Sequence, residues 1–279
     1  MNQAGFGQMR LGANRFTGWG PAVRWCFGGV FLLQFGLAYA RLWQPSFLVG
    51  DARWPEGLLL VLAAATTLAS LTRQLPAQNM MLAASIIVVV GGAAHTLGAL
   101  TGIPFGPYSY TQKIGQKLFE PLPWAMPVLW LVVILNARGV ARLVLRPWRR
   151  ARNYGFYVLG LSVALVVLFD LSLEPFATQV KEYWTWHVTK LHLDWYSAPY
   201  VNFLGWGLTA GLILAFAIPA LINKFPGKFP PDYQPLAVWV LVNSFLATGL
   251  ALHQLWPAFW LTAAGTLVTG VLAMCAPRW

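Results

Sequence analysis

The sequence predicts an all-α fold, a polytopic bundle of transmembrane helices with six to eight spans, eight being favoured. Of its 279 residues, 58% are hydrophobic and only 10% are charged, whereas roughly 25% are charged in an ordinary soluble domain. The chain also contains 15 tryptophans. A soluble core could not bury this much apolar surface, so a lipid bilayer must cover the remainder.

Eight apolar segments approach the ~20 residues that a helix needs to cross a bilayer. They lie near 22–41, 56–72, 79–100, 123–145, 155–174, 201–222, 235–253 and 255–275. The first resembles a signal peptide, but we interpret it as a retained span because hydrophobic segments continue down the chain. The second is short, and the last two are close enough to form a helical hairpin. Without an evident internal repeat, residues 1–279 are expected to form a single integral membrane domain.

The distribution of basic residues predicts the orientation of these spans. In a soluble protein the net charge of +11 would suggest nucleic acid, but here Lys and Arg mark cytoplasmic loops, and we expect no nucleic-acid partner. With the N-terminus inside, the inner segments hold thirteen basic residues and the outer loops hold six. We therefore expect a multi-pass protein of the inner cell membrane with both termini cytoplasmic and with membrane lipids as neighbours.

Span parity brings most of the unusual polar residues to one membrane face. The first group spans 95–110, where His95 is followed by a Pro- and Gly-rich turn that ends the helix. Tyr108 and Tyr110 lie two residues apart and would share one side of an extended segment. An ordinary interfacial aromatic belt is the alternative interpretation.

The second group contains two acids at the end of the fifth span. Asp170 and Glu174 are four residues apart and therefore share one face of a helix, and Pro175 predicts the helix end at about Glu174. Acids within or at the edge of a span are candidates for a functional site. The alternative is that both side chains reach into the water outside the membrane.

The third group is an aromatic loop, 176–200, which leads into the sixth span. It contains Trp186 and Tyr196, and Asn202 and Trp206 follow it. A buried Asn202 would need a hydrogen-bonding partner. The density of aromatic residues beside two acids suggests a pocket for an extended apolar ligand or for a developing cation.

Neither a metal nor a cofactor is expected. No two of the four histidines are three or four residues apart, the spacing at which paired ligands converge on a helix. The two cysteines, Cys26 and Cys275, have no metal-binding spacing. The sequence also has no Walker loop and no Gly-x-Ser-x-Gly elbow.

Three motifs, in this order, resemble a family of multi-span carotenoid-biosynthesis proteins. They are Thr101-Gly-Ile-Pro-Phe-Gly-Pro-Tyr-Ser-Tyr110, Asp170-Leu-Ser-Leu-Glu-Pro175 and Tyr196-Ser-Ala-Pro-Tyr-Val-Asn-Phe-Leu-Gly-Trp206. The family includes bacterial carotenoid 1,2-hydratases and archaeal bisanhydrobacterioruberin hydratases, and the resemblance covers about 80–225. The chain departs from the family pattern in having Glu174 where Asp is frequent, His95 where Glu is frequent, and Tyr196-Ser-Ala-Pro where Tyr-Gly-Val-Pro is frequent.

The resemblance implies a cofactor-independent lyase that adds water to the terminal isopropylidene double bond of an acyclic or monocyclic carotenoid. Asp170, and after it Glu174, would donate the proton, and two acids one turn apart could hold one proton between them. The candidates to position water or to shape the pocket are His95, Tyr108, Tyr110, Asn202, Trp206, Tyr196 and Trp186. Other enzymes of carotenoid biosynthesis are possible partners.

Two other functions fit the sequence less well. A non-enzymatic carrier of carotenoids or other isoprenoids would need the aromatic residues but not the acids. A small-solute transporter should show interrupted helices in two matching halves, whereas Pro and Gly interrupt the chain only around 102–107. Replacing the acids therefore distinguishes an enzyme from a carrier.

Overall fold

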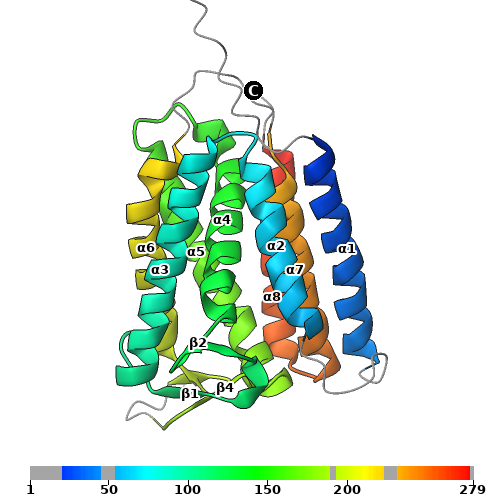
Figure 1. Cartoon of the computed structure of the whole chain (residues 1–279), viewed down its shortest axis with the longest axis vertical. Coiled ribbons are helices and arrows are strands. Elements are labelled where there is room, and N and C mark those ends of the chain that lie inside the picture. The colour runs from blue at the N-terminus through cyan, green and yellow to red at the C-terminus, as the bar shows by residue number, and fades with distance from the viewer. Residues whose placement is uncertain (1–20, 45–53, 189–192, 223–230, 277–279) are drawn as a thin grey trace, which may run out of the picture.

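A computed structural model describes residues 21–44, 54–188, 193–222 and 231–276. These residues form eight α-helices that run side by side along the long axis of the molecule (Figure 1). The helices are α1 (Pro21–Trp43), α2 (Trp54–Leu71), α3 (Ala77–Thr101), α4 (Ala125–Val144), α5 (Tyr154–Pro175), α6 (Tyr200–Leu221), α7 (Gln234–Leu252) and α8 (Trp256–Cys275). The predicted all-α helical bundle is confirmed.

Seven of these helices are long and apolar enough to cross a membrane. The exception is α2, whose apolar part, Pro55–Leu71, falls short of that length. The prediction that the second apolar segment is short for a membrane span is therefore confirmed. The protein is a multi-pass membrane protein in which α2 lies beside the longer helices (Figure 1).

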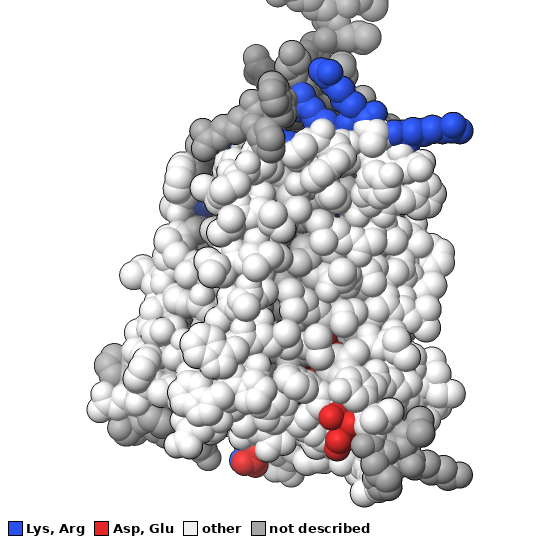
Figure 2. Space-filling model, turned by 180° about the vertical axis from the view of Figure 1, so that it is seen from behind, with Lys and Arg blue, Asp and Glu red and all other residues white. Residues whose placement is uncertain are grey.

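The face of the molecule drawn in Figure 2 has a wide uncharged belt between two charged ends. Figure 2 shows Lys and Arg side chains at one end, Asp and Glu side chains at the other, and mainly uncharged residues between them. Large apolar side chains such as Trp25, Phe156, Leu204 and Leu267 are exposed along the helices. Exposed apolar side chains of this size are expected where a helix faces lipid.

The central helix of the bundle is α4. It contacts α2, α3, α5, α7 and α8, and most of its residues are buried. Gly139 allows α7 to pack against it, because a Cβ atom there would lie 2.4 Å from Cβ of Pro235. The helices that carry the candidate site therefore pack around a buried axis.

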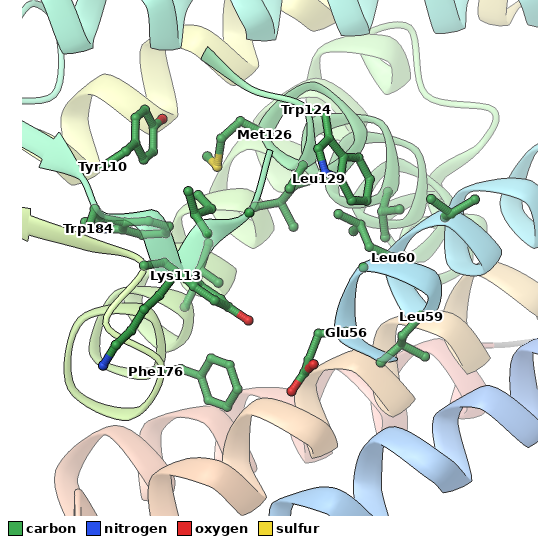
Figure 3. Close-up of a pocket in the computed structure, with 18 of the residues that line it drawn as sticks. Glu56, Leu59, Leu60, Tyr110, Lys113, Trp124, Met126, Leu129, Phe176 and Trp184 are labelled. Atoms are coloured by element: carbon green, nitrogen blue, oxygen red, sulfur yellow. The ribbon is translucent and has the colours of Figure 1, made fainter. Parts of the chain in front are cut away.

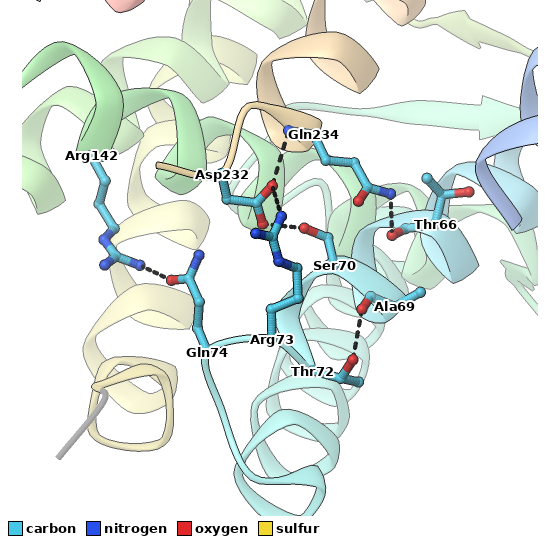
Figure 4. A network of polar contacts seen from close by, with 9 residues as sticks. All are labelled: Thr66, Ala69, Ser70, Thr72, Arg73, Gln74, Arg142, Asp232 and Gln234. Carbon is cyan, nitrogen blue, oxygen red and sulfur yellow. Dashed lines mark hydrogen bonds and ion pairs between the residues drawn. The ribbon is translucent and has the colours of Figure 1, made fainter. Parts of the chain in front are cut away.

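At the end opposite the strands, a polar network connects α2, α4 and α7 (Figure 4). Asp232, which precedes α7, accepts a hydrogen bond from Ser70 of α2 and lies 3.7 Å from the Arg73 guanidinium. The Arg142 guanidinium of α4 donates to Gln74 at 3.0 Å. These contacts fix the loop between α2 and α3 against the neighbouring helices.

Within the described part of the chain, the other end carries six short strands in three antiparallel pairs. The strands are β1 (Tyr108–Tyr110), β2 (Lys117–Phe119), β3 (Leu122–Pro123), β4 (Trp184–Trp186), β5 (Asp194–Trp195) and β6 (Ala198–Pro199), with the short helix η2 (Gln112–Ile114) between β1 and β2. β1 pairs with β4, β2 with β3, and β5 with β6. These loops cover the end of the bundle at which the predicted polar residues gather.

The α-helix ends at Pro175, close to the expected end at about Glu174, but the helical path does not stop there. The chain continues through Pro175 into one π-helical turn, η4 (Phe176–Val180), in which Lys181 N donates to Phe176 O at 3.0 Å. Proline cannot donate to the carbonyl four residues earlier, which is that of Leu171. The indole of Trp195 donates to this carbonyl instead, at 2.9 Å, so a side chain supplies the hydrogen bond that proline removes.

Candidate functional site

The two acids of α5 lie inside the bundle. Asp170 is 0% exposed and Glu174 is 1% exposed, so the interpretation that both reach into water was wrong. Asn202, in the first turn of α6, donates from its side-chain nitrogen to both: 2.8 Å to Asp170 Oδ2 and 2.9 Å to Glu174 Oε1. One amide group thus connects the two carboxyl groups, which lie one helical turn apart.

Two indoles from β4 complete the surroundings of Glu174. Trp184 Nε1 donates to Glu174 Oε2 at 3.1 Å, and Trp186 Nε1 donates to the same oxygen at 3.0 Å. Alternate residues of a strand point to the same side, so the Trp-Thr-Trp segment directs both indoles at one carboxyl group. Glu174 therefore accepts three hydrogen bonds from α6 and β4.

The hydrogen bonding of the two acids is unequal. Asp170 accepts from Asn202 through Oδ2, while its Oδ1 is buried and has no hydrogen-bond partner. None of the ion pairs of the described residues includes either acid. Two buried carboxyl groups this close together, without a cationic partner, disfavour a negative charge on both at once.

His95, near the end of α3, faces the two tyrosines of β1. Tyr108 donates its hydroxyl to the His95 carbonyl at 3.1 Å, and the Tyr110 hydroxyl lies 2.9 Å from His95 Nδ1. Burial raises the pKa of Tyr108 and that of Tyr110, so both are neutral hydroxyl groups. The other ring nitrogen, His95 Nε2, is buried without a partner.

Aromatic rings enclose the imidazole. Phe105 stacks on it with ring centroids 4.7 Å apart, and Trp206 meets it edge-on at 5.9 Å. Trp206 in turn stacks on Trp130 at 4.4 Å. Gly205 allows α6 to pack closely against Pro104 and Phe105, because a Cβ atom at Gly205 would lie 2.8 Å from both the Phe105 ring and the Pro104 carbonyl oxygen.

These groups surround a small cavity. A water molecule can occupy about 10 Å³ of it, which is close to the roughly 10–15 Å³ that one water needs. The lining residues are His95, Phe105, Tyr108, Tyr110, Met126, Glu174, Trp184, Trp186, Asn202 and Trp206. Asp170 does not line it and is connected to it only through the hydrogen bond from Asn202, so Glu174 is the acid on the cavity wall.

A much larger cavity of about 1180 Å³ adjoins the small one. Its walls are mainly apolar side chains of α2, α4, α5, η4 and α7, such as Leu60, Leu129 and Phe176. Its rim carries charged residues such as Glu56 and Lys113 (Figure 3). Three residues line both cavities: Tyr110, Met126 and Trp184. We call these three residues the partition.

The structure brings together most of the residues that the sequence suggested. Asp170, Glu174, Asn202, His95, Tyr108, Tyr110, Trp186 and Trp206 lie in one hydrogen-bonded or stacked cluster. Tyr196 does not join it. It lies in the turn between β5 and β6, with a φ of 50°, and packs edge-on against Trp195.

Sequence reasoning missed three residues of the site: Trp184, Met126 and Phe105. Trp184 had a signal, because it lies two residues before Trp186, as Tyr108 does before Tyr110. Phe105 lies inside the motif Thr101–Tyr110 and could have been included for that reason. Met126 had no signal, since an apolar residue at the start of an apolar helix carries no mark of its neighbours. Among the described residues no group of three or more His, Cys, Asp or Glu side chains is placed to hold a metal ion.

Comparison with known proteins identifies the chain's relatives. A family model described as "Carotenoid biosynthesis protein" matches residues 56–273, extending on both sides of the 80–225 region that carries the motifs. The bisanhydrobacterioruberin hydratase of Haloarcula japonica is 29% identical over 116 residues, which are 42% of this chain and 37% of that protein. The aligned region thus spans little more than a third of the relative's length. No solved structure matches the chain.

Proposed function

The chain belongs to the carotenoid biosynthesis protein family, and on that premise we propose that it is a hydratase. It would add water to the terminal isopropylidene double bond of an acyclic or monocyclic carotenoid by acid catalysis. The observation that carries this proposal is the buried pair Asp170 and Glu174, linked by Asn202 and adjoining a large apolar cavity. The similarity to a protein named as a hydratase supports the same reaction.

The reaction needs an acid, a cavity that excludes bulk water and a group that tolerates positive charge. The acid pair transfers a proton to the less substituted alkene carbon, which leaves a tertiary cation on the other carbon. Water adds to that cation, and the proton it loses returns to the pair. The indoles of Trp184 and Trp186 and the ring of Tyr110 border this position, and aromatic faces stabilise a nearby cation.

The roles of the two acids differ in this proposal. Sequence reasoning favoured Asp170 as the donor, but Glu174 lines the small cavity and Asp170 does not. Glu174 is therefore the group that contacts the alkene. Asp170 lies one helical turn away and shares the Asn202 donor with Glu174, so a negative charge on Asp170 keeps the proton on Glu174.

The large cavity is the proposed site for the polyene. At about 1180 Å³ it exceeds the ~300–1,000 Å³ typical of small-ligand pockets, and its apolar walls suit an extended hydrocarbon. The end group would reach Glu174 through the partition. Met126 is the flexible member of the partition, because methionine is unbranched and adapts its shape easily.

Expression in a host that accumulates lycopene or γ-carotene tests the activity. Pigments extracted from such cells should gain the mass of one water for each isopropylidene end group, and an empty-vector strain should show no gain. The large apolar cavity would also serve a carotenoid carrier, the second candidate. A carrier would bind or retain pigment without changing its mass, and that result would reject the hydratase.

A further inference from the structure

We propose that the small cavity between His95, Tyr110 and Glu174 binds one water molecule, and that this water is the one added to the substrate. The inference rests on the proposed hydratase function and assigns the second reactant to a site of its own. The polyene would occupy the large cavity, while the water would wait on the far side of the partition.

The size of the cavity selects its occupant. Its occupiable volume of about 10 Å³ matches a single water, whose requirement is roughly 10–15 Å³. It is too small to admit a carotenoid end group unless the partition moves aside. A buried water also needs two to four polar partners. The wall includes five residues with polar side chains that can supply such partners: Tyr108, Tyr110, Glu174, Asn202 and His95.

His95 supplies the most specific argument. Its side chain is buried, and its Nε2 atom has no hydrogen-bond partner among the described residues. A buried polar atom without a partner is costly and is often satisfied by an ordered water. Nδ1 is already within hydrogen-bonding distance of the Tyr110 hydroxyl at 2.9 Å, which fixes the ring orientation and leaves Nε2 for a water in the cavity.

The bound water determines which product the cation forms. After Glu174 has transferred its proton, the tertiary cation has two fates: it can lose a proton from an adjacent carbon and return to an alkene, or water can add to it. A water already bound to His95 and Tyr110 forms the C–O bond, and its proton passes to the Glu174 carboxylate. His95 and Tyr110 thus favour addition over return, without taking part in the first proton transfer.

Deuterium exchange separates these two steps. In D₂O the acid pair carries deuterium. A protonation followed by return leaves deuterium in the recovered alkene whenever the cation loses a protium, whereas each addition leaves hydrated product. Membranes containing the wild-type protein are incubated with carotenoid in D₂O, and mass spectrometry measures both pigments. The informative quantity is the ratio of hydrated product to deuterated alkene.

Tyr110→Phe keeps the ring and removes the hydroxyl that holds His95, and His95→Phe removes the proposed water ligand. We expect each to lower the ratio about tenfold, as the loss of one hydrogen bond to the water would, while deuterium still enters the alkene. His95→Gln, which retains a polar group, should restore part of the ratio. Glu174→Gln is the matched contrast, because it should abolish exchange and hydration together.

The outcomes distinguish this inference from the proposed function. If the wild-type protein yields neither deuterated nor hydrated pigment, the hydratase itself is rejected. If it yields both, and Tyr110→Phe loses both in equal proportion at matched membrane content, the residues do not hold the water and the inference is overturned. Should His95→Phe fail to accumulate, the comparison of Tyr110→Phe with wild type decides.

Discussion

At the residue scale, the buried polar cluster depends on Asn202. The sequence predicts that Asn202 needs a partner if buried and that Asp170 and Glu174 share a helix face, and these expectations are confirmed. It does not predict that one amide serves both acids, because that contact joins α5 to α6. Trp184 was missed for a similar reason, since its indole reaches Glu174 only through the pairing of β4 with β1.

Asn202→Leu should therefore damage both stability and activity. It leaves two buried carboxyl groups without a shared donor, at a cost of about 1–3 kcal/mol in the free energy of unfolding, and it removes the group that sets their geometry. Thermal unfolding in detergent and pigment conversion measure the two effects. The matched control is Asn243→Leu, since Asn243 is also buried in a helix but donates to Trp239 O of its own helix. Equal effects of both changes on conversion would contradict the role of Asn202.

At the element scale, the pairing of β1 with β4 builds the site. Tyr108 lies opposite Trp186 and Tyr110 opposite Trp184, so four aromatic side chains from two distant segments face the ends of α3 and α5. The two-residue spacing of the tyrosines predicts their common side, but not their partner strand, because strands this short owe their pairing to the helices beneath them. The continuation of the helix through Pro175 was also unpredictable, since the Trp195 indole that donates to the Leu171 carbonyl lies 24 residues away in the sequence.

The start of α4 contributes Met126 to the partition, and the size of the side chain at this position should control access to Glu174. Met126→Ala widens the passage and should preserve hydration, whereas Met126→Phe should reduce it by closing the passage. Overpacking of the core would cost the phenylalanine variant roughly 1–3 kcal/mol of stability, so conversion is compared at equal membrane content. The control is Met80→Phe, a change at a buried methionine that lines neither cavity. A Met126→Ala protein as inactive as Met126→Phe would show that Met126 acts by packing alone.

At the scale of the whole molecule, segment length and hydropathy predicted the spans. The eight apolar segments correspond to α1–α8, and the segment noted as short, α2, is the one below spanning length. The central position of α4 and the large cavity could not be predicted from the sequence, because both depend on the distances between helices rather than on any one helix. The single-domain organisation of residues 1–279 stays a prediction.

The orientation in the inner membrane is a second expectation at this scale. We propose that both termini are cytoplasmic and that the loops carrying β1 and β4 face the opposite side, because Lys and Arg gather at the other end (Figure 2). Reporter fusions truncated after Lys117 and after Arg150 should report opposite sides, with the Arg150 fusion cytoplasmic. Two fusions reporting the same side would contradict the span count, and a reversed pair would contradict the orientation.

The central claim is that a buried acid pair protonates a carotenoid double bond, and carboxyl-to-amide substitution tests it most directly. The ratio of hydrated to unmodified pigment is measured for Glu174→Gln, Asp170→Asn and Glu182→Gln at matched membrane content. Glu182 is the control, an exposed acid near the same end of the bundle whose carboxylate pairs with Lys113 at 2.5 Å. An amide keeps the size of the acid but cannot donate its proton, and general acid catalysis is worth ~10²–10⁴ in rate. The ratio should fall to near zero for Glu174→Gln and strongly for Asp170→Asn, and should stay at the wild-type value for Glu182→Gln. Near-wild-type conversion by Glu174→Gln and Asp170→Asn would contradict the account.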